Sequence, residues 1–235
     1  MSKEDFNPTL KSSLKKKGSI KFALDGIKLV FEYIYYILFK WRKFHLNDAT
    51  YNYFYYPYNA TWRNEREVEV PIVWNEVKKC EPEKVLEIGN VLSHYFNVKH
   101  DILDKYEKLP RIINEDATNF KTDKRYDLIV AISTFEHVGW DESPKEPTKI
   151  IKTIENLKKL LSKNGKIIFT IPADYNPELD KLIKKGKIRL NEVYFMKRIS
   201  KDNKWIQIEE KDIEGIKFES PFPRANGLII GFINK

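Results

Sequence analysis

Short apolar runs alternate with helical stretches from residue 84 onward, and this alternation limits the fold more than any other feature. Five runs predict buried strands, at 84–88, 100–106, 111–114, 126–133 and 165–172. Residues 148–162 carry apolar side chains at helical spacing, so an amphipathic helix is expected there, with Gly165 in a left-handed position after its end. Strands that alternate with helices predict a parallel sheet covered on both faces.

The last part of the chain has a different pattern. Residues 188–199, 204–210 and 227–233 predict strands without long helices between them, which favours antiparallel strands at one side of the sheet. The expected fold is therefore α/β: a Rossmann-like, mostly parallel seven-stranded sheet with helices on both faces, an antiparallel edge and an N-terminal helical extension.

The chain divides into three parts by composition. Residues 1–19 predict a basic flexible tail, 20–64 a helical, aromatic-rich extension, and 65–235 the main domain. In the extension, apolar residues recur at helical spacing, but the uninterrupted run from Tyr33 to Phe39 is far shorter than the roughly 20 residues that span a bilayer. Two interpretations stay open: a helix packed on the domain, or an interfacial helix that gives residues 20–46 a peripheral membrane contact.

The charge and the cysteine content of the chain limit its expected partners and its expected cellular compartment. The net charge is +8, and the excess gathers near the N-terminus, in Lys11 and Lys15 to Lys17. This fits a solvated surface or an anionic partner. The one cysteine, Cys80, allows neither an intramolecular disulfide nor a thiolate zinc cluster, which fits a cytoplasmic setting. No cleavable signal peptide is expected, because the first apolar run begins late and lacks a small-residue cleavage site. No metal is expected, because the four histidines lack the spacing of metal ligands.

The end of the first predicted strand carries the main functional signal. The strand ends with Glu87, Ile88 and Gly89, and a helix is expected to follow. Ligands of open α/β sheets bind at the carboxyl ends of strands, where a glycine lets the backbone approach closely. The G-x-G-x-x-G pattern is absent, which disfavours a pyrophosphate ligand. Near the end of the second strand, Asp104 offers a carboxylate for ribose hydroxyls, and Asp101 competes if that strand ends earlier.

The stretch VLEIG (85–89) is similar to the first motif of class I S-adenosylmethionine (SAM)-dependent methyltransferases, although Asn90 to His94 replace the further glycines that are usual in the family. The resemblance implies SAM as cofactor, with this loop against its amino-acid part, Asp104 at the ribose, and Asp116 with Ala117 at the adenine. The cofactor-binding residues that it implies are Glu87, Gly89, Asn90, Asp104, Asp116, Ala117 and Ser133.

Ser133 to Val138 follow the fourth predicted strand and contain Glu136 and His137. Many class I methyltransferases that act on small molecules show a similar Glu-His pair. The resemblance implies that both are catalytic, and His137 could deprotonate an acceptor hydroxyl because its unperturbed pKa lies near neutrality. The alternative is that the pair caps a helix or lines the cofactor pocket.

Residues 59–69 are similar, more loosely, to the N-terminal part of methyltransferase-like proteins encoded among polysaccharide-biosynthesis functions. Trp62, Arg63 and Arg66 are the expected acceptor-binding residues, because guanidinium groups pair with carboxylates and phosphates. A salt-bridge network within the protein is the alternative for each arginine.

Taken together, the sequence predicts a SAM-dependent enzyme that methylates an oxygen of a small, glycan-type or lipid-linked acceptor. One alternative is a nucleic-acid methyltransferase, which is disfavoured because no Asn/Asp-Pro-Pro-Tyr/Phe motif follows the fourth strand. The other is a non-catalytic binding protein, suggested by the missing loop glycines. The oligomeric state is left open.

Overall fold

The computed structural model describes residues 19–235. The expected basic tail therefore lies outside the described residues, apart from Ser19, where α2 (Ser19–Phe39) begins. A short antiparallel hairpin of β1 (Lys43–Leu46) and β2 (Ala49–Asn52) follows, then the 3-10 segment η1 (Tyr58–Arg63). No helix within the described residues has the length and apolar character that crossing a membrane requires.

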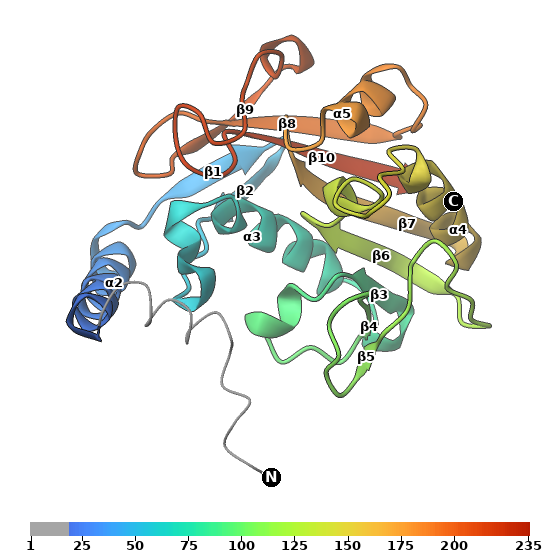
Figure 1. Cartoon of the computed structure of the whole chain (residues 1–235), viewed down its shortest axis with the longest axis horizontal. Coiled ribbons are helices and arrows are strands. Elements are labelled where there is room, and N and C mark those ends of the chain that lie inside the picture. The colour runs from blue at the N-terminus through green and yellow to red at the C-terminus, as the bar shows by residue number, and fades with distance from the viewer. Residues whose placement is uncertain (1–18) are drawn as a thin grey trace.

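The main sheet has eight strands in the order β5-β4-β3-β6-β7-β10-β8-β9. Figure 1 shows β9 at one edge and β5 at the other. The first five strands in that order are parallel: β5 (Ile112–Ile113), β4 (Asp101–Leu103), β3 (Val85–Ile88), β6 (Tyr126–Ile132) and β7 (Leu161–Pro172). The others join antiparallel: β10 (Gly227–Asn234), β8 (Glu192–Arg198) and β9 (Trp205–Ile208).

This sheet confirms the expected fold, a mostly parallel Rossmann-like sheet with an antiparallel side, extended by one strand beyond seven. The chain leaves β3 toward β4 and β5, whereas it leaves β6 toward β7 on the other side. The direction of winding therefore reverses between β3 and β6. Such a reversal leaves a crevice at the carboxyl ends of the two strands.

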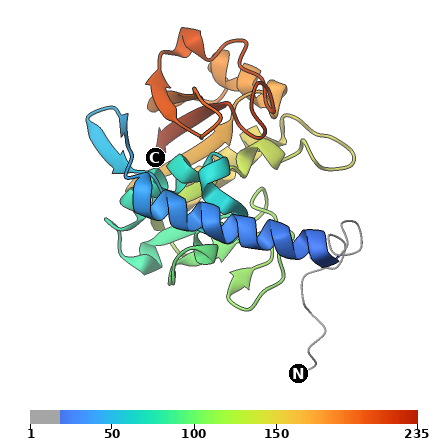
Figure 2. The ribbon, with the colours of Figure 1, turned by 90° about the vertical axis from the view of Figure 1, so that its left-hand side faces the viewer.

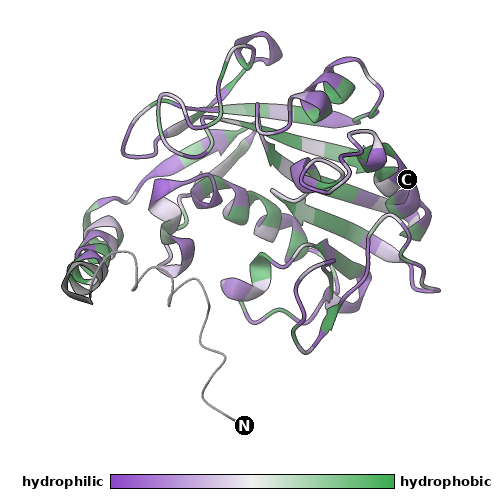
Figure 3. Ribbon diagram, in the orientation of Figure 1, coloured by the Kyte–Doolittle hydropathy of each residue, from purple (hydrophilic) through white to green (hydrophobic). Residues whose placement is uncertain are grey.

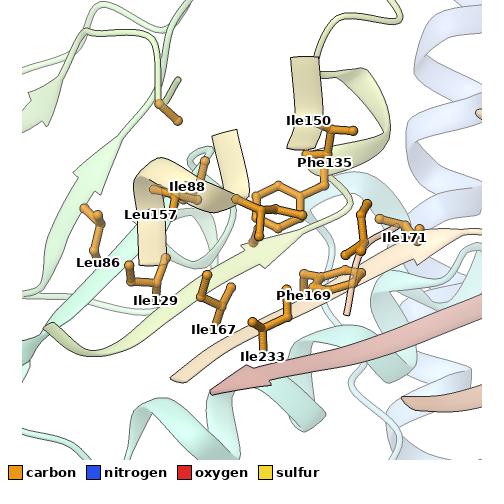
Figure 4. Packing of buried hydrophobic residues seen from close by; sticks show 14 of the residues in the cluster. Leu86, Ile88, Ile129, Phe135, Ile150, Leu157, Ile167, Phe169, Ile171 and Ile233 are labelled. Atoms are coloured by element: carbon orange, nitrogen blue, oxygen red, sulfur yellow. The ribbon is translucent and has the colours of Figure 1, made fainter. Parts of the chain in front are cut away.

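Side chains of β6 alternate between two hydrophobic cores. Leu128, Val130 and Ile132 pack in the core that contains the apolar residues of α3 (Arg66–Val77). Ile129 and Ala131 pack in the other core, against α4 (Lys149–Leu160) and α5 (Pro177–Lys184). Helices thus cover both faces, which explains the nearly continuous apolar sequence of this strand. Figure 3 shows the central strands as the most hydrophobic part of the molecule, and Figure 4 shows the core beneath α4.

Two local expectations were wrong. The helix expected after Gly89 is only the single 3-10 turn η3 (Leu92–His94). The helix α4 ends at Leu160, and Gly165 lies inside β7 without a left-handed conformation. A Cβ atom at Gly165 would lie 2.6 Å from the carbonyl oxygen of Tyr126, so this glycine permits a close approach of two strands. The remaining 3-10 turns are η2 (Pro82–Lys84), η4 (Phe135–His137) and η5 (Glu210–Asp212).

Candidate active site

A cavity of about 400 Å³ opens at the carboxyl ends of β3, β4, β5 and β6, where the winding reverses. We call it the switch-point cavity. Its volume is within the range of small-molecule sites. Seven of the predicted site residues line it: Gly89, Asn90, Asp104, Asp116, Ala117, Ser133 and His137. A larger depression, of about 890 Å³, lies between α5 and residues 209–217, and none of the predicted site residues lines it.

Gly89 forms the floor of this cavity in a conformation that requires glycine. Its φ is +80°, and its N–H donates to the carbonyl oxygen of Leu103 at 2.9 Å. A Cβ atom here would lie 2.6 Å from Oγ1 of Thr134, on the loop that follows β6. The sequence explained Gly89 by the approach of a ligand, whereas the structure adds a protein neighbour, Thr134, that also lines the cavity.

Glu87 lies under the loop rather than in the cavity. Its buried Oε1 accepts hydrogen bonds from the N–H groups of Val91 and Leu92, both at 2.8 Å. Its Oε2 lies 2.8 Å from Nε2 of His100, which is also buried. These contacts fix the loop that follows β3 without the further glycines that the family usually has. The sequence did not single out His100, because its partner comes from a different strand.

Asp104 lies at the cavity and Asp101 does not. Asp104 directly follows β4, with Oδ2 accepting from the N–H of Asn90 at 3.2 Å, while Oδ1 accepts from two N–H groups of its own loop. Asp101 begins the strand, at its other end, and pairs with Lys124 at 2.6 Å and the hydroxyl of Tyr126 at 2.8 Å. Of these two carboxylates, only that of Asp104 lines the cavity.

Asp116 belongs to an ion-pair cluster on one wall of the cavity. Its Oδ2 lies 2.7 Å from Nζ of Lys149 and 3.0 Å from Nζ of Lys105, and both lysines also pair with Glu142. Burial alone would raise the pKa of Asp116, but the hydrogen bonds from Lys149 and Thr118 hold that pKa well below its ordinary value. Sequence reasoning missed the other three members, because Lys105 and Glu142 lie in loops and Lys149 in the first turn of a helix.

His137 stands at the opening of the cavity with two polar neighbours. Its Nδ1 lies 2.5 Å from Oδ2 of Asp141, and this carboxylate also accepts from the hydroxyl of Tyr175 at 2.8 Å. Burial alone would raise the pKa of Asp141, but the hydrogen bonds with His137 and Tyr175 hold that pKa below its ordinary value. Nε2 of His137 lies 3.7 Å from Oε1 of Glu136, so a proton on Nδ1 would leave Nε2 as an acceptor beside this buried carboxyl. Asp141 follows His137 by one helical turn, a spacing that could have suggested the pair.

Ser133 connects the loop after β6 to a buried acid of α3, and Glu136 is buried in the same loop. The Ser133 hydroxyl donates to Oε1 of Glu69 at 2.7 Å. Glu136 is 1% exposed, its Oε2 has no hydrogen-bond partner, and its side chain does not line the cavity. Burial raises the pKa of Glu136 well above its ordinary value, and the nearby Glu69 adds to the effect. Burial therefore favours the uncharged form of this carboxyl, which makes a catalytic role as a base less favourable.

Trp62, Arg63 and Arg66 do not line the cavity. The indole N–H of Trp62 and the Nε of Arg63 donate to the same carboxylate oxygen of Glu32, at 3.2 and 3.0 Å. Arg66 pairs with Glu69, and the charges of Glu69 and Glu65 outweigh burial and raise its pKa. Two of the three expected acceptor residues thus hold α2, and acceptor binding by them stays a prediction.

No cluster of three or more His, Cys, Asp or Glu side chains suited to a metal ion occurs among residues 19–235. No protein-family model matches the chain, and no curated protein is similar to it. Solved structures similar to it include N-methyltransferase NodS from Bradyrhizobium japonicum WM9 in complex with S-adenosyl-L-homocysteine, at 15% identity and TM-score 0.46 over 73% of this chain and 87% of that one.

A SAM-dependent methyltransferase from Archaeoglobus fulgidus is similar at 15% identity and TM-score 0.45, over 77% of this chain and 100% of that one. One from Clostridium acetobutylicum ATCC 824 is similar at 14% identity and TM-score 0.39, over 87% of this chain and 97% of that one. With TM-scores below 0.5, these similarities add nothing to the fold that strand order and pairing already define.

Proposed function

We propose that this chain is a SAM-dependent methyltransferase that binds SAM in the switch-point cavity. One observation carries the proposal: the ends of three successive strands bring Gly89, Asp104 and Asp116 to a single cavity at the point where the winding reverses. These are the positions at which the resemblance of VLEIG implies the amino-acid, ribose and adenine parts of SAM. The lack of a phosphate-binding glycine pattern favours a phosphate-free nucleoside.

The residues of the cavity fit this cofactor. The Asp104 carboxylate accepts three hydrogen bonds from backbone N–H groups, two of them on Oδ1, so Oδ2 can accept a further hydrogen bond from a ribose hydroxyl. Asn90 lies beside it at the turn, and Ala117 offers a backbone N–H next to the Asp116 carboxylate, which Lys149 keeps ionised. When bound, SAM supplies a methyl group that is attached to a sulfonium sulfur, and this sulfur is a good leaving group. The protein therefore chiefly has to align the acceptor and exclude water.

For the reaction itself, we propose O-methylation with His137 as the base. Nε2 of His137 would take the proton of an acceptor hydroxyl as the new carbon–oxygen bond forms, while Asp141 keeps the ring oriented. The acceptor that we propose is a small, glycan-type or lipid-linked molecule, in line with the looser resemblance to methyltransferase-like proteins of polysaccharide biosynthesis. A lipid-linked acceptor would also bring residues 20–46 close to a membrane.

Calorimetric titration with S-adenosylhomocysteine tests the cofactor site. We expect Asp104→Asn to weaken binding by about 1–2 kcal/mol, because one charged acceptor is lost while the size of the side chain is kept. Asp101→Asn is the matched control, since it removes a carboxylate from the other end of the same strand. No heat with the wild-type chain would refute SAM binding. If only the Asp101 variant bound S-adenosylhomocysteine more weakly, the ribose would have to bind near Asp101 rather than Asp104.

His137→Gln tests the base. With labelled SAM and glycolipid or small-molecule extracts as acceptors, we expect methyl transfer to fall by about 10²–10⁴-fold, the usual contribution of a general base. Affinity for S-adenosylhomocysteine should change little. Equal transfer rates in the two proteins would show that the acceptor needs no base, as for a neutral amine.

A further inference from the structure

The helix α2 is attached to the domain by its polar and aromatic face. Tyr33 and Tyr36 stack against the ring of Trp62, with centroid distances of 5.6 and 5.9 Å. Glu32 accepts hydrogen bonds from Trp62 and Arg63, as described above. These three side chains are spaced by one and three residues, so they form one stripe along the helix. The helix therefore presents its less apolar side to the protein.

The opposite face of α2 is apolar and exposed. Phe31 is 68% exposed and Leu38 is 56% exposed, and they lie on a stripe at helical spacing with the other exposed apolar residues Leu24, Ile27, Val30, Ile34 and Ile37. Trp41, 87% exposed, follows just beyond the helix. A helix on a globular protein normally turns this stripe inward. Figure 2 shows α2 lying across the outside of the molecule, with the rest of the described chain behind it.

Lysines outnumber acidic residues in the sequence around this stripe, from residue 11 to residue 43. Lys28 lies on the exposed part of the helix and Lys43 is exposed shortly after it. The sequence before α2 adds Lys11 and Lys15 to Lys17. An exposed apolar stripe flanked by lysines, with an aromatic ring at one end, is the composition of helices that lie in the headgroup region of a membrane. Lysines near such a helix are attracted to anionic lipids.

We propose that the outward face of α2 docks on an anionic membrane surface, with the helix lying in the plane of the headgroups. A helix of 21 residues gives a contact about 30 Å long. A second copy of the chain is the less favourable occupant, because each chain has a net charge of +8 and two copies repel each other. The proposal is independent of methyl transfer and would hold for a chain that does not bind SAM.

Vesicle co-sedimentation tests this docking with the full chain, using phosphatidylcholine vesicles with and without 30% phosphatidylglycerol as the anionic lipid. We expect binding to the anionic vesicles, weakened by raising the salt from 0.05 to 0.5 M. The double variant Phe31→Glu, Leu38→Glu should reduce partitioning at least tenfold. Leu109→Glu is the matched control, because Leu109 is 51% exposed in a loop far from α2 in the sequence, and it should bind like the wild type.

Two further measurements decide the outcome. Circular dichroism should show the same helix content in both glutamate variants, because the substituted side chains of α2 point away from the domain. Sedimentation equilibrium reports self-association. The proposal is overturned if the wild-type chain does not bind anionic vesicles, if the double variant binds them as well as the control, or if the stripe mediates a dimer that leaves no vesicle binding.

Discussion

The helices α2 and α4 are both amphipathic, yet they turn their apolar stripes in opposite directions. In α4, Ile150, Ile154 and Leu157 are buried against the sheet, and Lys152 and Lys159 are exposed on the other side. In α2, Glu32, Tyr33 and Tyr36 face the domain, and the aliphatic residues face outward. Helical periodicity reveals a stripe but not its partner. A stripe beside a β-sheet finds a core, whereas one at the periphery needs an occupant from outside the fold.

The largest expected effect is a difference in the free energy of unfolding between variants of the α4 stripe and variants of the α2 stripe. Leu157→Ala removes a fully buried side chain, so the free energy of unfolding should fall by about 2–5 kcal/mol. Ile34→Ala, on the exposed stripe of α2, should change it by less than about 0.5 kcal/mol. Urea denaturation of the two variants measures both. Similar losses would mean that the α2 stripe is covered within the protein, which would break the comparison.

A second difference concerns buried acidic side chains, which hold the segment between α2 and the sheet in place. Glu67 is buried between Arg42 and Asn203. Burial raises the pKa of Glu67 to about 9, although Arg42 and Asn203 oppose the shift. The folded protein therefore holds a proton that the unfolded chain releases above its ordinary pKa of 4.5. Stability from this group is present below pH 4.5 and is lost as the pH rises toward 9.

Glu67→Gln should remove this pH dependence. Wild-type stability is expected to fall by up to about 1.4 kcal/mol per pH unit between pH 5 and 9 relative to the variant. The measurement is the free energy of unfolding in urea at several pH values, in wild type and variant. Parallel curves would show that Glu67 is ionised in the folded protein. Glu178→Gln, at an exposed position of α5, provides the matched control.

The sequence predicted much of the cavity and little of the region around α2, for physical reasons. Gly89 and Asp104 could be placed because the carboxyl ends of neighbouring parallel strands meet at one edge. The role of Glu87 could not, because a buried acid that accepts backbone hydrogen bonds looks the same in sequence as one that faces a ligand. Trp62 and Arg63 were expected at the acceptor because their partner, Glu32, lies 30 and 31 residues earlier.

Local signals also failed where the structure is set by distant contacts. The strands β1 and β2 have only four residues each, too few for a periodic pattern. The helix expected after Gly89 is replaced by one 3-10 turn, and Glu87 holds that loop through the N–H groups of Val91 and Leu92. The fold could thus be predicted from patterns along each strand, whereas these details depend on single contacts across the chain.

The smallest expected effect tests how α2 is held. Arg63→Ala removes one of the two donors to Glu32, and Arg63 is half exposed, so the contribution to global stability should be only about 0.2–1 kcal/mol. The local effect should be clearer: amide hydrogens of residues 27–38 should exchange faster, while those of α4 should not change. Lys152→Ala, which removes an exposed ion pair from α4, is the control. If exchange in α2 stays the same in the arginine variant, then stacking of Tyr33 and Tyr36 on Trp62 is sufficient to hold the helix, and its attachment is aromatic rather than ionic.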